Sequence, residues 1–282
     1  VVEFAQIVFE NGFEIYLVGG AVRNLKRGLP PDDYDFTTNA TPQQISSIFK
    51  KVIPTGIEHG TVTVLFKGNS FEVTTYRIDG KYSNSRHPDS IKFSSDIYED
   101  LKRRDFTINA MAVDVRDDRL IDANGGMDDL KHGIIRAIGN PDERFAEDGL
   151  RILRACRFAA QLDFEIEPIT LAGMKHNREH LKNISAERIR DEILKTMSVD
   201  HPSRAFLYMK ETDILEYVLP ELLEGVGMEQ RERHQFDVFH HMLYSCDFME
   251  KDPVLRMAAL LHDIGKPRCY KLRDGVPTFY GH

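Results

Sequence analysis

A change of sequence pattern near Pro141 limits most strongly what this chain can fold into. Before it, short apolar runs rich in Val, Thr and aromatic residues alternate with single helical segments. After it, helical periodicity continues through most of the chain. Runs of the first kind pair into sheets, whereas amphipathic segments pack as helices. The sequence pattern therefore predicts a small α/β head followed by a helical remainder.

The pattern is specific enough to place individual elements. In the head we expect a helix capped by Thr41, a polar mobile loop at residues 79–95, and strands at residues 15–18, 33–36, 61–66 and 71–76, the last two forming a hairpin. In the remainder we expect helices at residues 142–160, 168–181, 185–198, 202–210, 235–250 and 253–262.

Composition argues against several classes of protein. The 282 residues contain no apolar stretch of the roughly 18 residues that a membrane span needs, and no secretory signal is visible. Three scattered cysteines argue against a disulfide framework or a structural zinc site and favour a cytoplasmic protein. The net charge of -8 leaves RNA binding undecided. Because the first residue is Val1 rather than Met, we expect a few residues to precede it.

Two aspartates in the second expected strand form a candidate metal site. Side chains alternate along a strand, so Asp33 and Asp35 project from one face. Mg²⁺ takes one or two carboxylates and completes its shell with water and substrate phosphates, and nucleotidyl transfer uses two such ions. Alone, an Asp-x-Asp pair is more often a solvated loop. A turn at Gly19 and Gly20 favours a nucleotide site, because its backbone N–H groups and Arg23 suit a phosphate.

Together the two segments resemble a known family. Residues 19–23 (GGAVR) and 33–38 (DYDFTT) are similar to the signature of class II tRNA nucleotidyltransferases and bacterial poly(A) polymerases, within the DNA polymerase β-like superfamily. Asn24 departs from the family, whose members usually carry Asp there. The resemblance implies that Gly20 and Arg23 serve the triphosphate and that Glu72 is a third carboxylate, which activates the primer hydroxyl. Without the resemblance, a solvent-facing strand residue is an equal interpretation of Glu72.

Residues 103–110 (RRDFTINA) are a long match to a second motif of the same family. Adjacent arginines suit a triphosphate or a ribose, while Asp105 and Asn109 can hold the surrounding loop. The resemblance places Arg104, Asp105 and Asn109 at the nucleotide. A solvated basic turn is the alternative when these residues are considered alone.

A third segment carries charged residues at every third position of an expected helix, namely Asp148, Arg151, Arg154 and Arg157. An amphipathic helix with an i,i+3 ion pair, worth about 0.2–0.5 kcal/mol, explains the spacing. It does not explain the fit to nucleobases. A carboxylate accepts hydrogen bonds and a guanidinium donates them, so Asp148 and Arg151 complement cytosine and adenine but not guanine or uracil. The resemblance likewise places these two residues on the incoming base, with Arg154 and Arg157 nearby.

Other segments distinguish members of the family. Residues 53–64 are similar to the tRNA enzymes and unlike the poly(A) polymerases. The loop that contains residues 79–82 and 86–88 is expected to be absent from enzymes that add only CC, since it helps to switch from CTP to ATP. A complete CCA-adding enzyme and a dedicated A-adding enzyme both remain open.

Histidines late in the chain indicate a possible second metal site. His262 and Asp263, preceded by His241 and followed by His282, have the spacing of an HD domain, and residues 262–267 (HDIGKP) match its central motif. Such a set can hold a divalent metal that activates water. A degenerate domain kept as a helical scaffold is an equal alternative, because the sequence ends before a final Asp ligand. We also expect RNA-gripping helices to follow His282.

We therefore predict an α+β fold. A polymerase β-like nucleotidyltransferase head with a mixed sheet spans residues 1–138, a helical neck that selects the nucleotide and binds RNA spans 139–200, and a helical body with a partial HD domain spans 201–282. We predict that the chain adds C and A from CTP and ATP to the 3′ end of tRNA, with two Mg²⁺ ions at Asp33 and Asp35. The alternatives are an A-adding enzyme, a poly(A) polymerase, an HD phosphohydrolase acting on RNA ends, and an RNA-binding module without catalysis.

Overall fold

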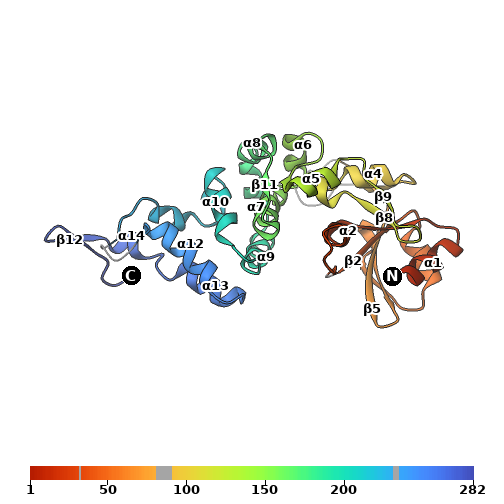
Figure 1. Cartoon of the computed structure of the whole chain (residues 1–282), viewed down its shortest axis with the longest axis horizontal. Coiled ribbons are helices and arrows are strands. Elements are labelled where there is room, and N and C mark those ends of the chain that lie inside the picture. Colours follow the sequence, from red (N-terminus) through yellow and green to blue (C-terminus); the bar gives the residue numbers. More distant parts are fainter. Residues whose placement is uncertain (32, 81–90, 231–234) are drawn as a thin grey trace. The chain divides into compact units, whose positions relative to one another are not determined.

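The computed structural model describes residues 1–31, 33–80, 91–230 and 235–282, and it divides into two compact units. The first unit is Val1–Asn140 and the second is Pro141–His282 (Figure 1). Each unit is described by itself below. The further division of residues 139–282 into a neck and a body stays a prediction.

A mixed sheet forms the centre of the first unit, as predicted, and it has seven strands. Its strand order is β3-β4-β5-β2-β1-β8-β9. The β2–β5 pair is parallel and the other pairs are antiparallel. The bounds of these strands are β1 Ile15–Val18, β2 Tyr34–Thr38, β3 Val52–Gly56, β4 Thr61–Phe66, β5 Asn69–Thr75, β8 Ala112–Asp114 and β9 Arg119–Ile121.

The long polar loop is less irregular at its ends than the sequence predicted. Strand β6 (Arg77–Asp79) pairs antiparallel with β7 (Ile91–Phe93), so residues 91–93 form a strand rather than a loop. The two strands form a ribbon that includes apolar Ile78 and Phe93. The sequence did not predict this ribbon, because the turn-forming residues nearby favoured a loop. The remainder of the predicted loop, including Lys81, Tyr82 and residues 86–88, lies outside the described residues.

Helices and short 3-10 segments complete the first unit: α1 Val2–Glu10, α2 Gly19–Lys26, α3 Pro42–Ile48, η1 Ile57–His59, α4 Ile97–Lys102, η2 Thr107–Asn109 and α5 Gly126–His132, together with strand β10 Ile134–Ile135. Thr41 caps α3 through a capping box with Gln44, as the sequence predicted for the cap. On one side of the sheet Phe4 stacks on Phe49 and Phe71, with ring centroids 4.8 and 4.5 Å apart.

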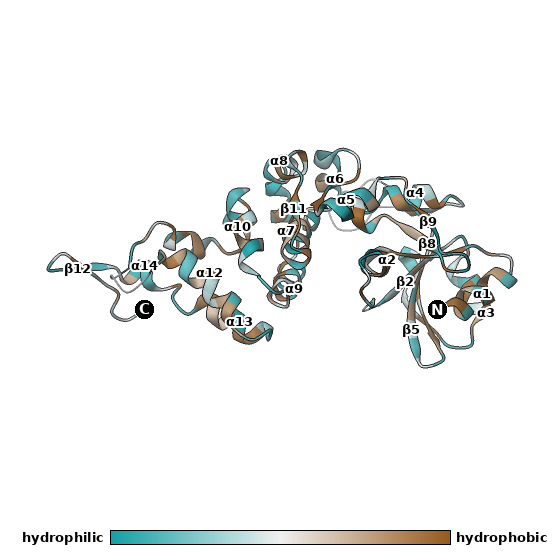
Figure 2. Ribbon diagram, viewed as in Figure 1, coloured by the Kyte–Doolittle hydropathy of each residue, from teal (hydrophilic) through white to brown (hydrophobic). Residues whose placement is uncertain are grey.

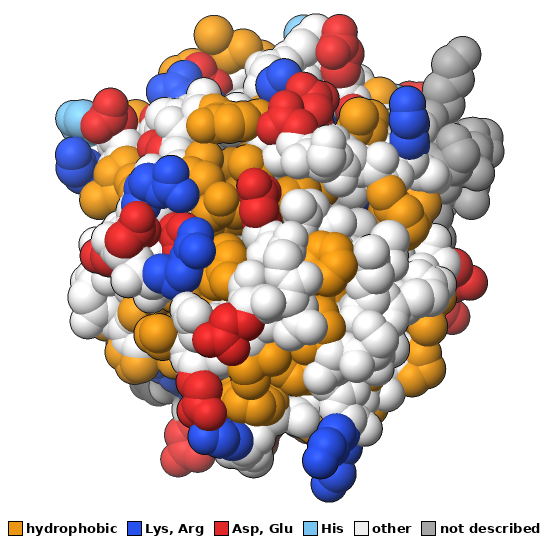
Figure 3. Space-filling view, turned by 90° about the vertical axis from the view of Figure 1, so that its right-hand side faces the viewer, with side chains coloured by type: hydrophobic (Ala, Val, Ile, Leu, Met, Phe, Trp, Pro, Cys, Tyr) orange, Lys and Arg blue, Asp and Glu red, His pale blue; other side chains and the backbone are white. Residues whose placement is uncertain are grey.

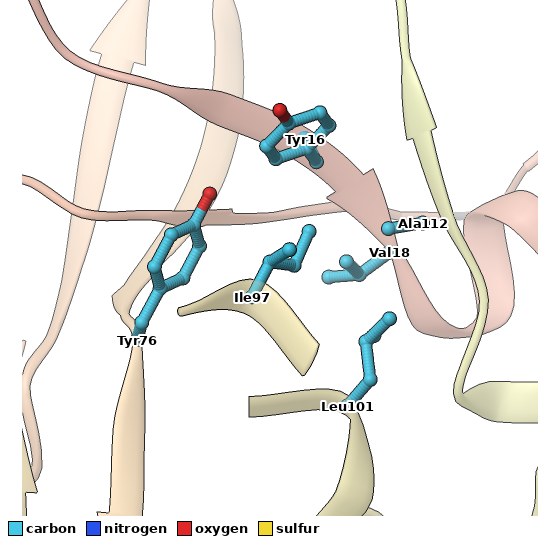
Figure 4. Packing of buried hydrophobic residues seen from close by; sticks show 6 residues of the cluster. All are labelled: Tyr16, Val18, Tyr76, Ile97, Leu101 and Ala112. Carbon is cyan, nitrogen blue, oxygen red and sulfur yellow. The ribbon is translucent and has the colours of Figure 1, made fainter. Parts of the chain in front are cut away.

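Helix α4 covers part of the opposite face of the sheet. Its Ile97 and Leu101 pack against Tyr16 and Val18 of β1 in a buried cluster (Figure 4). Residues paired across neighbouring strands face the same side of a sheet. Tyr16 pairs with Thr37 and Val18 with Asp35, so Asp35 lies on the face that α4 covers.

The second unit is helical, as predicted, with short strands in addition. Its elements are α6 Pro141–Glu147, α7 Leu150–Leu162, β11 Glu165–Ile166, α8 Pro168–His176, η3 Arg178–Asn183, α9 Ala186–Met197, α10 Ser203–Glu211, α11 Leu215–Val218, η4 Pro220–Gly225, α12 Val238–Phe248, α13 Pro253–Leu261, α14 Lys266–Cys269, β12 Lys271–Arg273 and β13 Val276–Thr278. Figure 2 shows hydrophilic and hydrophobic residues alternating along these helices, as expected for segments with one buried face.

The helix predicted at residues 142–160 is instead two helices, α6 and α7, so that prediction was wrong at its centre. The break falls at Asp148 and Gly149. A Cβ at Gly149 would lie 3.0 Å from the backbone carbonyl carbon and oxygen of His180. Only glycine lets the chain approach η3 this closely, and the sequence pattern gave no sign of that contact.

In the part of the chain that the structure describes, no helix has the length and apolar character needed to cross a membrane. On the face in Figure 3, basic side chains stand next to acidic ones, with hydrophobic side chains between them. This face shows no broad region of one charge sign. Like the net charge of -8, it does not indicate by itself whether the chain binds RNA.

Candidate active site

Two of the predicted carboxylates stand opposite each other on neighbouring strands of the head. Asp35 on β2 pairs in register with Glu72 on the parallel strand β5. Asp33 immediately precedes β2, two residues before Asp35. A β-strand directs every second side chain to the same face, so this arrangement gathers the three acidic groups around one point of the sheet.

The electrostatics of these carboxylates favour a bound cation. Burial raises the pKa of Asp35 above its ordinary value; Arg104 opposes this rise, and the charge of Asp33 adds to it. Burial also raises the pKa of Glu72, and so do the charges of Asp35 and Asp33. A divalent cation would relieve this repulsion, and carboxylate oxygens are ligands that Mg²⁺ prefers. The residues present therefore fit a divalent metal site.

The turn between β1 and α2 brings a helix N-terminus to the carboxylates. Gly19 has φ +68°, a left-handed conformation that favours glycine. A Cβ at this position would lie 3.6 Å from both the Nη1 atom of Arg104 and the Oδ2 atom of Asp35. Gly20 follows in the first turn of α2, where its missing side chain leaves room for the Arg23 guanidinium, 3.4 Å from the position of a Cβ. Backbone N–H groups at such a helix start suit a phosphate.

Arg23 belongs to a buried network that includes two other predicted nucleotide-binding residues. Its Nη1 donates to the Oδ1 of Asn109 at 2.6 Å, and the Nδ2 of Asn109 donates to the Oδ1 of Asp105 at 3.1 Å. All three side chains are buried. Asp105 and Asn109 thus hold Arg23 of α2 in place within the head. A direct contact of either residue with a nucleotide stays a prediction.

Asp100 on α4 is a residue of this site that the sequence analysis missed. Its carboxylate accepts hydrogen bonds from Arg103 and Arg104, and from the Oγ1 of Thr37 on β2. Its spacing, three and four residues before the two arginines, is the signal that could have identified it. The contact with Thr37, 63 residues away in the chain, had no such signal.

Asp35 lines two hollows. The larger, of about 230 Å³, is lined by residues that include Glu72, Arg103 and Arg104. The smaller, of about 170 Å³, is lined by Gly20, Ala21, Arg23, Asn24, Asp33 and Asp35. Both hollows combine carboxylate and guanidinium groups, the combination that a metal–triphosphate complex requires.

In the second unit, the predicted base-reading carboxylate Asp148 has two partners. Its Oδ1 accepts from the backbone N–H of Leu150 at 3.1 Å, and its Oδ2 accepts from the Nη2 of Arg188 on α9 at 2.8 Å. Another nitrogen of that guanidinium, Nη1, is buried and has no hydrogen-bond partner among the described residues. Arg188 was not among the predicted site residues, because it is 40 positions from Asp148.

The three arginines of the same segment differ in their surroundings. Arg151 donates to the carbonyl of Arg144 at 2.9 Å and forms an ion pair with Glu147. Arg157 is buried in an ion pair with Glu192 of α9 and lies against the Phe158 ring at 4.2 Å. Arg154 is half-buried and lies 5.2 Å from the same ring. These contacts hold Arg151 and Arg157 on the helix, and contacts of the three arginines with a nucleotide stay predictions.

The four residues of the possible second metal site come together in the second unit. Nε2 of His262 lies 3.0 Å from the Oδ2 of Asp263, and the Nε2 atoms of His241 and His282 each lie 3.4 Å from an oxygen of the same carboxylate. One ligand atom each from His241, His262 and Asp263 all lie within 4.8 Å of one another. The Nδ1–H of His262 donates to the Ala259 carbonyl at 2.7 Å, so its Nε2 lone pair can bind a metal.

Lys266 modifies this second cluster and was not foreseen as part of it. Its Nζ lies 2.5 Å from the Oδ2 of Asp263 and donates to the Oε1 of Gln230 at 2.7 Å. The buried carboxylate therefore already has a cationic partner.

The head and its carboxylates define a class of protein. A mixed sheet with a glycine turn beside an Asp-x-Asp strand is the architecture of nucleotidyltransferase heads. Residues 15–136 match the family model of the poly A polymerase head domain. Residues 163–225 match the model described as a probable RNA and SrmB-binding site of polymerase A.

Relatives and solved structures agree with these matches. A CCA-adding enzyme of Lactobacillus helveticus is 47% identical over 213 residues, which are 76% of this chain and 53% of that protein. One from Ligilactobacillus salivarius is 46% identical over 208 residues, 74% of this chain and 51% of that protein. The chain thus spans about half the length of these relatives.

Among solved structures, the Bacillus stearothermophilus CCA-adding enzyme in complex with CTP superposes with a TM-score of 0.76 and 32% identity, covering 94% of this chain and 63% of that one. The Thermotoga maritima CCA-adding enzyme complexed with tRNA has a TM-score of 0.66 and 25% identity, covering 93% and 67% respectively. The chain belongs to the family of class II tRNA nucleotidyltransferases and poly(A) polymerases.

Proposed function

We propose that this chain adds C and A to the 3′ end of tRNA, using CTP and ATP and no template. The observation that carries the proposal is the in-register pairing of Asp35 with Glu72, beside the glycine turn and Arg104. The relatives named as CCA-adding enzymes, and the solved relatives that hold CTP or tRNA, support the choice of substrates.

The proposed reaction is a nucleotidyl transfer. The 3′-oxygen of the tRNA attacks the α-phosphorus of the incoming nucleotide, and a new phosphodiester bond forms. The bond from the α-phosphorus to the oxygen that bridges it to the β-phosphorus breaks, so pyrophosphate leaves. The attacking hydroxyl loses its proton, for which Glu72 is a suitable acceptor because burial and neighbouring charges raise its pKa.

Mg²⁺ bound by Asp33 and Asp35 would neutralise the developing charge and align the attacking and leaving oxygens. The remaining residues bind and orient the substrate. The N–H groups at the start of α2 and the guanidinium of Arg23 face a triphosphate from one hollow, and Arg104 faces it from the other. Asp105 and Asn109 hold Arg23.

In the second unit, Asp148 and Arg151 read the base by hydrogen bonds. An acceptor beside a donor complements the amino group and ring nitrogen of cytosine and adenine, and it leaves charged groups unpaired against guanine or uracil. Arg188 orients Asp148 through the ion pair at 2.8 Å. An Asp148→Ala substitution should therefore lose discrimination among nucleotides more than it loses the capacity for transfer.

The direct test is single-nucleotide extension of tRNA transcripts that end before the CCA tail or after its two C residues, with Mg²⁺ and one nucleotide at a time. Incorporation of C and then A, stopping at CCA, supports the proposal. Incorporation of A alone on the CC-ended transcript identifies an A-adding enzyme, and long A tails identify a poly(A) polymerase. If nothing is added while Mg²⁺ and CTP still bind, the chain acts as a binding module instead.

The His241, His262, Asp263 and His282 cluster favours a second activity, hydrolysis of phosphate esters at RNA ends by a metal-activated water. Incubation with Mn²⁺, Co²⁺ or Ni²⁺ and RNA that ends in a 2′,3′-cyclic phosphate tests it. Hydrolysis that disappears in His262→Ala and persists in Asp35→Asn supports a separate second site. A complete lack of hydrolysis with all three metals supports a structural scaffold.

The three cysteines Cys156, Cys246 and Cys269 are free thiols, and the first two are buried. Free thiols are usual where the surroundings keep them reduced. They support the proposal of a cytoplasmic location, where tRNA is the expected partner.

A further inference from the structure

We propose that Asp100 is a positioning residue for the nucleotide site, acting through Arg103 and Arg104. This inference rests on the proposed nucleotidyl transfer and adds to it a residue that orients the triphosphate-binding arginines. Asp100 is not expected to touch the substrate or the metal.

The first observation is that the Asp100 carboxylate is fully buried and accepts hydrogen bonds at both of its oxygens. Asp100 is 0% exposed. Nε and Nη2 of Arg103 donate to its Oδ1 at 2.9 and 2.8 Å. Nη2 of Arg104 and Oγ1 of Thr37 lie 3.2 and 3.1 Å from its Oδ2. Four donors to one buried carboxylate leave little freedom to either guanidinium.

The second observation is that this carboxylate stays ionised although it is buried. Burial acts to raise the pKa of Asp100, but the guanidiniums of Arg103 and Arg104 outweigh burial and hold the pKa below its usual range. A buried anion of this kind is stable only with its cations in place. The arrangement of the two arginines and the charge of Asp100 therefore depend on each other.

The third observation connects this cluster to the reacting groups. Thr37 and Asp35 are two residues apart on β2, so they lie on the same face of the sheet. Arg104 has its Nη1 3.6 Å from the position of a Cβ at Gly19, next to the Oδ2 of Asp35. Asp100 thus joins α4 to the metal-binding strand and holds Arg104 at the glycine turn.

Arg104 keeps hydrogen-bonding groups for a ligand. Its Nε is buried and has no hydrogen-bond partner among the described residues. Buried donors normally have partners, so an unpaired donor on an arginine that lines the hollow of about 230 Å³ points to an anionic ligand there. The phosphate oxygens of the incoming nucleotide have the required chemistry. Because Nη2 is held by Asp100, the orientation of the whole guanidinium, including its Nε and Nη1 groups, is fixed by that carboxylate.

The experiment compares Asp100→Asn with Glu99→Gln. Glu99 precedes Asp100 on the same helix, and its Oε1 makes an ion pair with Lys102 at 2.7 Å on the exposed surface, so the two changes remove equal charge. We expect Asp100→Asn to lower kcat/KM for both CTP and ATP by about 10- to 100-fold, as for loss of a hydrogen bond between charged groups. The ratio of CTP to ATP use should not change, and Glu99→Gln should match the parent.

A double-substitution cycle separates positioning from a general loss of structure. Because Asp100 acts through Arg104, adding Asp100→Asn to Arg104→Ala should cost far less than Asp100→Asn costs in the parent. Arg104→Lys should not restore the parent rate, since an ammonium lacks the Nε edge. Equal and independent losses from the two substitutions, or equal activity of Asp100→Asn and Glu99→Gln, would overturn the proposal.

Binding of CTP in the presence of Mg²⁺, measured by calorimetry, provides a readout that does not need turnover. If the parent chain binds CTP but adds no nucleotide to tRNA, the proposed function fails, while weaker CTP binding by Asp100→Asn still supports the role of Asp100. Thr37→Val removes one of the four donors and should give a smaller loss than Asp100→Asn. It serves as the second variant if Asp100→Asn does not fold, and an unchanged CTP affinity in Thr37→Val would then count against the proposal.

Discussion

In the head, burial raises the pKa of Asp35 and of Glu72, and the charge of Asp33 adds to both rises, while Arg104 opposes the rise at Asp35. In the second unit, the buried carboxylate of Asp263 has the Nζ of Lys266 at 2.5 Å and three imidazoles around it. The first cluster has an excess of negative charge and oxygen ligands only. In the second, the charge of Lys266 offsets that of Asp263, and most of the candidate ligands are nitrogens.

This difference indicates that the two clusters prefer different cations. Oxygen ligands with excess negative charge suit Mg²⁺, whereas imidazoles suit transition metals. A metal at the second cluster must also compete with Lys266 for Asp263. We therefore expect a cation to stabilise the head cluster, whereas the second cluster already contains the Lys266–Asp263 ion pair. The four predictions below test this contrast, beginning with the largest effect.

Asp35→Asn should reduce nucleotide addition by roughly 10³-fold, because it removes a metal ligand from the reacting centre. Asp263→Asn should abolish any metal-dependent hydrolysis and leave addition close to the parent rate. Extension of tRNA and hydrolysis of a 2′,3′-cyclic end, measured on the same preparations, provide the comparison. Asp128→Asn is the control, since the exposed side chain of Asp128 makes an ion pair with Lys131 at 3.7 Å and belongs to neither cluster. Loss of both activities in either variant would contradict two separate sites.

The same two substitutions should change stability in opposite directions when no divalent metal is present. Asp263→Asn leaves the buried Lys266 without its charge partner, which should lower the free energy of unfolding by about 1–3 kcal/mol. Asp35→Asn removes a charge from a repelling group and should raise the thermal midpoint. Thermal unfolding in buffer with a chelator measures both. A drop in the midpoint for Asp35→Asn would show that the head carboxylates stabilise the fold instead of straining it.

Lys266→Met should increase the affinity of the second cluster for Mn²⁺ or Co²⁺ by about tenfold, because the competing ammonium is gone. Titration calorimetry on the parent and the variant measures this change. His241→Ala should weaken the same binding, and the affinity of the head for Mg²⁺ should be equal in all three proteins. An unchanged affinity in Lys266→Met would mean that the lysine moves aside without cost.

The effect of Mg²⁺ on stability should depend on pH. Burial and like charges raise the folded-state pKa of Asp35 and Glu72, so without metal these groups favour folding below the ordinary carboxylate pKa of about 4. That contribution is lost as pH rises through the raised values. Mg²⁺ binds the ionised forms, so the shift in thermal midpoint caused by Mg²⁺ should grow over the same range. Scanning calorimetry with and without Mg²⁺ at a series of pH values measures this. A shift that does not vary with pH would contradict it.

The sequence predicted those features whose contacting residues are close together in the chain, and it missed those whose contacting residues are far apart. The strand at β1, the cap at Thr41 and most helices of the second unit followed from local sequence patterns, whereas the mixed sheet was expected from the family resemblance. The close approach of Gly149 to the backbone of His180 did not follow from such patterns, because the two residues are far apart in the sequence. Likewise, strand β7 rests on pairing with β6, which short apolar runs in a polar segment do not reveal.

The chemistry-bearing residues were visible in the sequence because their types and spacing are local properties. Three local patterns each predicted a structural feature. The Asp-x-Asp pair indicated one face of a strand, the double glycine indicated a turn before a helix, and the charges at every third position indicated one face of a helix. Partners from distant segments were determined only by the tertiary structure. The parallel pairing of β2 with β5 brought Glu72 opposite Asp35, the packing of α4 on the sheet buried Asp100 against Thr37, and α9 brought Arg188 to Asp148. Strand register and helix packing depend on the whole core, so no single segment specifies which distant charge will meet it.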